Sequence, residues 1–150
     1  MKNTVKVPPL YKRLLYLTLT SSWVSGSVYF ILDTWFPVQG EFGLSKNPYQ
    51  YFFLQIHGGS AFLMMILYGL FLGTHVSTSI SKKEMRKLGL TITGLIGFLI
   101  STAYLLYYLS NETLREITRY AHASVGFSLP FILASHILTA SNYKKRSASS

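Results

Sequence analysis

The chain has 150 residues, of which 49% are hydrophobic and 15% aromatic, and it carries a formal net charge of +9. Four separate windows of about twenty apolar residues leave little chain for a soluble domain, so we expect an integral membrane protein. The absence of cysteine excludes disulfides, iron–sulfur clusters, thiolate zinc sites and the covalent attachment of c-type haem. A nucleic-acid role is disfavoured because it needs a basic soluble surface.

The N-terminal third of the sequence predicts a basic tail, a membrane helix and a polar loop. Residues 1–13 hold four Lys or Arg and the pair Pro8 and Pro9, which indicates a cytosolic tail. The apolar run over about residues 14–36 is too long for the h-region of a cleaved signal peptide, so we expect a retained helix. Residues 37–50 are polar and rich in Gly and Pro, which is typical of a loop.

The remaining sequence predicts three more membrane helices and a second basic tail. We expect helices over about residues 51–80, 88–109 and 120–140, with a basic turn at residues 82–87 and a tail over residues 141–150. Pro130 lies within the last helix and should kink it. The predicted fold is therefore an all-α, integral membrane four-helix bundle that forms a single transmembrane domain over residues 1–150.

The distribution of Lys and Arg predicts the orientation of this bundle. Eleven of the fourteen fall in the two tails and the turn at residues 82–87. By the positive-inside rule, both termini are expected to be cytoplasmic, and contact with anionic lipid accounts for much of the positive charge. Four of the five acidic residues then lie on the outer side, where they would favour a basic partner: Asp33, Glu41, Glu112 and Glu116.

All four histidines of the chain, His57, His75, His122 and His136, lie in or at the ends of apolar runs. An ionisable residue inside a membrane is costly and indicates a function. At about 100° per residue, the spacing places His75 on the helix face of His57, and His136 about 40° from His122. The pairs are about 27 Å and about 21 Å apart along their helices, so one metal ion cannot use both members of a pair.

Parallel second and fourth helices would place His57 and His122 at the outer level and His75 and His136 at the inner level. Imidazole suits iron, and a histidine on each side of a porphyrin is a b-type haem ligation. Small residues follow the outer ligands by one turn, Ala61 after His57 and Gly126 after His122, where bulk would collide with a macrocycle. Arg119, three residues before His122, would suit a haem propionate, although an ordinary interfacial charge explains it equally well.

The sequence resembles small four-helix, cytochrome b-like membrane proteins of bacteria. The resemblance covers roughly residues 47–138 and rests on the motifs Ile56-His57-Gly58, Gly73-Thr74-His75, Leu106-Tyr107-Tyr108 and Leu129-Pro130 together with His122, Gly126 and His136. It implies two bis-histidine haems b, outer His57/His122 and inner His75/His136, that carry electrons between quinone and a periplasmic or membrane redox protein. It also implies a multi-pass protein of the bacterial inner membrane.

One departure from that family concerns the second helix. Histidine pairs in such proteins are usually spaced by about fourteen residues, whereas His57 and His75 are separated by eighteen. A tilt of about 40° would project the resulting 27 Å onto about 21 Å, and we expect a tilt or a local bulge to bring His75 level with His136. The longer spacing affects the predicted inner haem site, which contains His75, more than the predicted outer one.

Two other functional classes are compatible with the residues. A proton or ion transport bundle would use the histidines as relay groups, but the sequence offers it no Asp or Glu in mid-membrane. A non-redox membrane anchor would use them as structural residues. The small size of the chain favours a subunit of a larger complex or a homodimer in every case, and we expect an electron-transfer subunit in preference to an independent enzyme.

Overall fold

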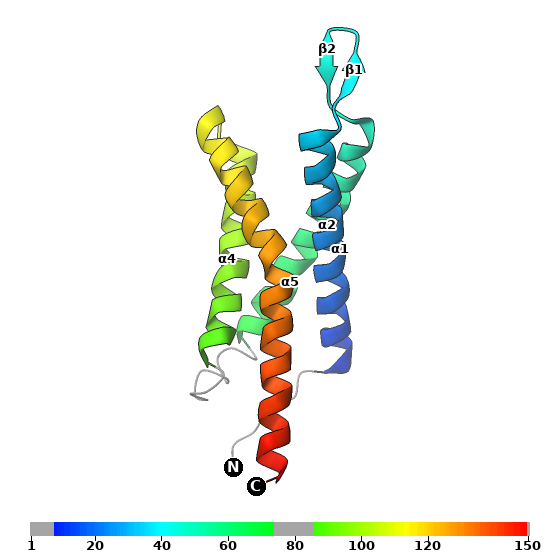
Figure 1. Ribbon diagram of the computed structural model, residues 1–150. Coiled ribbons are helices and arrows are strands. Elements are labelled where there is room, and N and C mark those ends of the chain that lie inside the picture. Colours follow the sequence, from blue (N-terminus) through cyan, green and yellow to red (C-terminus); the bar gives the residue numbers. More distant parts are fainter. Residues whose placement is uncertain (1–7, 74–85, 150) are drawn as a thin grey trace. The chain divides into compact units, whose positions relative to one another are not determined.

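The computed structural model describes residues 8–73 and 86–149. Within this part of the chain it is mostly helical, with helices α1 (Pro9–Trp35), α2 (Pro48–Phe71), α4 (Arg86–Tyr108) and α5 (Glu112–Ser149) and a short hairpin of β1 (Val38–Gly40) and β2 (Gly43–Ser45) (Figure 1). The chain divides into two compact units, one with α1, the hairpin and α2, the other with α4 and α5. The prediction of one domain stays a prediction.

All four helices begin earlier than the sequence predicted, and for α1, α2 and α5 the structure shows a reason. Pro9 occupies the first turn of α1, where a proline is favoured because its missing N–H is not needed. Asparagines precede the other two: the side chain of Asn47 accepts from the N–H of Tyr49, and that of Asn111 from the N–H of Leu114, both at 3.0 Å. Such caps satisfy N–H groups that have no partner inside the helix, and they explain starts at residues 48 and 112.

The segment between α1 and α2 is a hairpin at its centre, which the sequence prediction of a loop did not include. Val38 pairs with Ser45 and Gly40 with Gly43. Gly43 has φ of 114°, a conformation that other residues adopt only with strain. The side chain of Asn47 donates to the carbonyl oxygen of Phe36 at 3.1 Å, so the start of α2 is tied to the end of α1 beneath the hairpin.

Helix α5 continues well beyond the predicted segment of residues 120–140. It bends in its middle third (Figure 1), the part that contains Pro130. A proline removes one backbone hydrogen bond and crowds the preceding turn, which accounts for a bend without a break. The helix then runs through the basic residues 144–146, so this portion of the predicted tail is helical.

The four helices named above are each long and apolar enough to cross a membrane. Their large apolar side chains are widely exposed, while the buried residues include the polar Thr18, Ser25, Gln50 and Thr102. This distribution suits a lipid surround, in which apolar groups face outward and polar groups find partners between helices. The chain is thus a multi-pass membrane protein by the length and composition of its helices.

Candidate functional site

His57 lies against helix α1, within the first compact unit. Its Nδ1 is 2.9 Å from the carbonyl oxygen of Ser22 and 3.4 Å from the Ser22 hydroxyl. A carbonyl oxygen only accepts, so the proton of a neutral His57 ring lies on Nδ1 and the lone pair on Nε2. The ring therefore has the tautomer in which Nε2 can bind a metal, and its orientation is fixed by α1.

Gly26 allows this close approach. A Cβ atom at position 26 would lie 2.7 Å from both Nδ1 and Cε1 of His57, closer than non-bonded atoms can pack. The glycine is one turn beyond Ser22, so it clears the path by which the ring reaches the Ser22 carbonyl. Gly26 and Ser22 were not identified from the sequence, because a main-chain carbonyl oxygen and a missing side chain give no signal of their own.

His122 has a comparable partner in the second compact unit. Its Nδ1 is 2.8 Å from Oγ1 of Thr102 on α4, and Thr102 is buried with 6% of its surface exposed. That hydroxyl also lies 2.9 Å from the carbonyl oxygen of Phe98, to which it donates its single proton. With the proton on that carbonyl, the Thr102 oxygen accepts from Nδ1–H of His122, and the lone pair of a neutral ring lies on Nε2. Thr102 was also missed by the sequence analysis.

The predicted inner histidines are less completely described. His136 faces α4, where a Cβ on Gly89 would come 4.0 Å from its Cε1. Its Nδ1 is buried and has no hydrogen-bond partner among the described residues. His75 lies outside the described residues. The predicted pairing of His57 with His122 joins residues of the two units. That pairing and the pairing of His75 with His136 both stay predictions.

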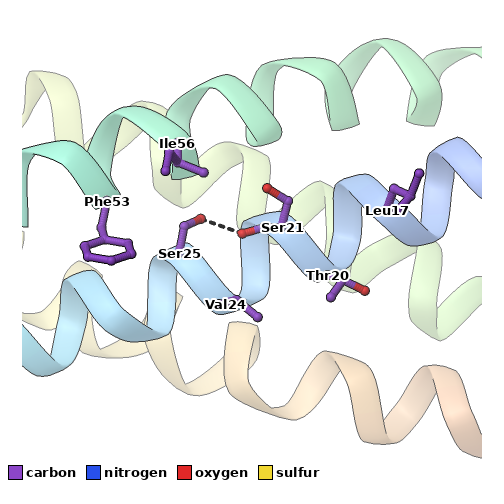
Figure 2. A pocket seen from close by; sticks show the side chains of 7 residues that line it. All are labelled: Leu17, Thr20, Ser21, Val24, Ser25, Phe53 and Ile56. Atoms are coloured by element: carbon purple, nitrogen blue, oxygen red, sulfur yellow. Dashed lines mark hydrogen bonds between the residues drawn. The ribbon is translucent and has the colours of Figure 1, made fainter.

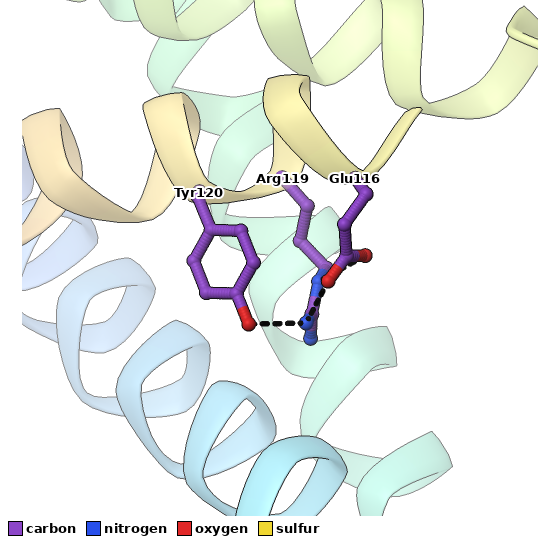
Figure 3. A network of polar contacts seen from close by, with 3 residues as sticks. All are labelled: Glu116, Arg119 and Tyr120. Carbon is purple, nitrogen blue, oxygen red and sulfur yellow. Dashed lines mark hydrogen bonds and ion pairs between the residues drawn. The ribbon is translucent and has the colours of Figure 1, made fainter. Parts of the chain in front are cut away.

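The other predicted site residues are placed as follows. Ala61 is half-buried one turn after His57. A Cβ at Gly126 would meet only Leu99, at an ordinary contact of 4.0 Å, so packing between described residues does not require this glycine. Arg119 forms a bidentate ion pair with Glu116, with contacts of 2.8 Å and 3.1 Å, and donates to the Tyr120 hydroxyl at 3.2 Å (Figure 3).

A groove of about 390 Å³ lies between α1 and α2 (Figure 2). Two of its hydroxyls are already engaged: that of Ser25 donates to the carbonyl oxygen of Ser21 at 2.6 Å, and those of Ser21 and Ser60 are 2.8 Å apart. Leu17, Phe53 and Ile56 supply much of the remaining wall. Such an apolar surface between membrane helices suits lipid chains and presents little chemistry of its own.

No family model, curated protein or solved structure matches the chain.

Proposed function

We propose that the protein is a di-haem b-type cytochrome that transfers electrons across the membrane between the quinone pool and a redox protein. The observation that supports this most directly is the shared state of His57 and His122. In each, Nδ1 contacts an oxygen of the neighbouring helix, the Ser22 carbonyl or the Thr102 hydroxyl. When that oxygen accepts the Nδ1 proton, Nε2 carries the lone pair that an axial ligand needs. Two histidines oriented in this way fit a b-type haem, which supplies one-electron redox chemistry.

The proposed ligand sets are His57 with His122 for the outer haem and His75 with His136 for the inner one. The buried Nδ1 of His136 has no partner among the described residues, so support for the inner set comes from the sequence spacing. Ala61 and Gly126 would leave room for the outer macrocycle, and Arg119 would lie near a propionate. With two sites at opposite edges of the bilayer, electrons would have water-accessible ends to enter and leave.

The proposed setting is the bacterial inner membrane with both termini cytoplasmic. In this orientation the outer end would carry Asp33, Glu41, Glu112 and Glu116, and it would receive the redox protein on the periplasmic side. Negative charge at that end favours encounter with a basic partner. The chain would act as one subunit of a larger complex or as a homodimer, surrounded by lipid and supplied with electrons by quinol or returning them to quinone.

An absorbance spectrum of the purified, reduced protein with a pyridine haemochrome count tests the proposal. We expect the spectrum of a low-spin, bis-histidine haem b and two haems per chain. Anaerobic addition of quinols of different potential should then reduce the haem. Protein that is folded and membrane-inserted, but contains no haem after expression with ample haem supply, would contradict the proposal and favour a transport bundle or an anchor.

A further inference from the structure

A polar cavity lies at the hairpin end of the first compact unit, where α1 ends and α2 begins. Its volume is about 250 Å³, and its lining comes from the last turn of α1, from β2 and from the start of α2. A water molecule takes up about 30 Å³ in the liquid, so the cavity has room for a group of several heavy atoms.

The two sides of this cavity have opposite charge. Asp33 lies in the last turn of α1, which ends at Trp35, and Lys46 lies two residues before Pro48, where α2 begins. The backbone at a helix C-terminus carries a partial negative charge, and the backbone at a helix N-terminus a partial positive one. Each side chain has the same sign as the helix end beside it, so the cavity has one anionic and one cationic wall.

The Asp33 carboxylate is held in place on the anionic side. It is half-buried, and its Oδ1 accepts from the amide nitrogen of the buried Gln50 at 3.2 Å. A carboxylate has about four lone-pair positions, so this bond leaves it able to accept from a ligand. On the cationic side Lys46 is exposed, and its flexible stem lets the ammonium group follow an anion beside α2.

Exposed aromatic side chains near the cavity indicate its depth in the membrane. Trp35, Tyr49 and Tyr51 lie at the hairpin ends of α1 and α2, with exposed fractions of 63%, 69% and 65%. Trp and Tyr concentrate at the boundary between the hydrocarbon core and the head groups of a bilayer. Because both helices are candidate membrane spans, this pattern places the cavity at the level of the phospholipid head groups.

From these observations we infer that the cavity binds the head group of phosphatidylethanolamine. Its ammonium group donates to the Asp33 carboxylate, and its phosphate lies beside Lys46 and the start of α2. A zwitterionic head group matches both walls, whereas an anionic lipid such as phosphatidylglycerol meets the like charge of Asp33. The trimethylated ammonium of phosphatidylcholine has no N–H to donate, and proteins recognise such a group with aromatic rings, which are absent from the described lining of this cavity.

A series of phosphatidylethanolamines with identical acyl chains and increasing N-methylation tests this inference. Native mass spectrometry of the detergent-solubilised protein measures the lipid concentration that half-saturates one site per chain. We expect the affinity to fall by about tenfold from the unmethylated to the trimethylated lipid, the size of a lost hydrogen bond between charged groups. Phosphatidylglycerol should bind no better than the trimethylated lipid. Equal binding of every member of the series would overturn the assignment without any substitution in the protein.

Substitutions then locate the site. Asp33→Asn keeps the shape of the side chain and removes its charge, so binding of phosphatidylethanolamine should weaken by about tenfold and the effect of methylation should disappear. Glu41 is an exposed acidic residue in the turn of the same hairpin and does not line the cavity, so Glu41→Gln should change neither. Lys46→Gln should weaken binding of phosphatidylethanolamine by about threefold, as expected for an exposed charge. Thermal unfolding checks that each variant is folded.

A soluble competitor separates the lipid from a free phosphate compound. Glycerophosphoethanolamine has the same head group without acyl chains, and it should compete only at concentrations far above those of the lipid, because it buries no apolar surface. Competition at equal concentration would overturn the lipid assignment, as would equal effects of Asp33→Asn and Glu41→Gln. Lipid binding and haem content are separate readouts, so this inference and the proposed function can fail independently.

Discussion

The two helix pairs orient a histidine in the same way but with different chemical groups. In the α1–α2 pair, His57 donates to a main-chain carbonyl, that of Ser22, and a glycine one turn away makes the approach possible. In the α4–α5 pair, Nδ1 of His122 shares a hydrogen bond with a side-chain hydroxyl, that of Thr102. The first arrangement depends on a missing side chain and the second on a side chain that is present, so different substitutions should disturb them.

The second histidine of the α4–α5 pair extends this comparison. His136 lies opposite Gly89 much as His57 lies opposite Gly26, but with a wider separation: a Cβ would be 4.0 Å away at position 89 and 2.7 Å away at position 26. Nδ1 of His136 has no hydrogen-bond partner among the described residues. A glycine beside a histidine is thus insufficient, because the ring must also reach an acceptor.

The largest expected effect comes from removing the histidines themselves. His57→Ala and His122→Ala should each lower the pyridine haemochrome count from two haems per chain to one, because each removes an axial ligand of the same iron. The double variant should also retain one haem. If each single variant retained one haem and the double variant retained no haem, the two histidines would serve different haems.

A matched pair of glycine substitutions should separate the two helix pairs next. Gly26→Ala places a methyl group 2.7 Å from the His57 ring, and such overpacking typically costs about 1–3 kcal/mol. We expect lower thermal stability and partial loss of the outer haem. Gly89→Ala meets only an ordinary contact and gains helix propensity, about 1 kcal/mol at most, so it should be neutral or slightly stabilising. If Gly26→Ala and Gly89→Ala lost equal amounts of stability and of haem, the two glycines would not differ in how closely a histidine packs against them.

Removal of hydroxyl groups should disturb the α4–α5 pair more than the α1–α2 pair. Thr102→Val deprives the His122 Nδ1–H of its acceptor, and loss of such a partner weakens metal binding by about tenfold or more. It should also raise the midpoint potential of one haem, because a less basic imidazole stabilises ferric iron less. Ser22→Ala leaves the carbonyl acceptor of His57 in place and should change little. Redox titration measures both, with Thr91→Val, an exposed threonine of α4, as the control.

An unchanged potential in Thr102→Val, with haem still bound, would show that Thr102 does not act through His122. A shift of the same size in Thr91→Val would attribute the effect to α4 as a whole. A large shift in Ser22→Ala would indicate that the hydroxyl of Ser22, 3.4 Å from Nδ1, contributes more than its carbonyl oxygen.

The helices could be predicted from the sequence because membrane helices depend on a local property, a run of apolar residues long enough to cross lipid. The ends of the helices were less predictable. Asn47 caps the start of α2 and Asn111 caps the start of α5, and both lie in stretches whose polarity indicated loops. The hairpin was missed for a different reason, because strands of three residues are too short for an alternating pattern to be recognised.

The histidines could be predicted because an ionisable residue in an apolar segment is conspicuous. Their partners could not, because Ser22 contributes only a carbonyl oxygen, which every residue has, and Gly26 contributes the absence of a side chain. Thr102 is one of many hydroxyl residues on these helices, and others, such as Thr91 and Ser101, bond only to their own helix among the hydrogen bonds described. The register between helices decides which hydroxyl meets a histidine, and no single segment encodes it.

The smallest expected effect concerns the ion pair at the start of α5. Arg119 holds Glu116 at 2.8 Å on an exposed part of the helix. Because salt screens such exposed charges, neither Arg119→Gln nor Glu116→Gln should alter the stability of the protein measurably. If Arg119 lies near a propionate of the outer haem, Arg119→Gln removes a positive charge and should lower the midpoint potential of that haem. Glu116→Gln removes a negative charge and should raise it. Redox titration at low and high ionic strength measures both shifts, which should have opposite signs and shrink with added salt. Two variants with unchanged potentials at low salt would remove Arg119 from the proposed haem site and leave it as an ordinary interfacial charge.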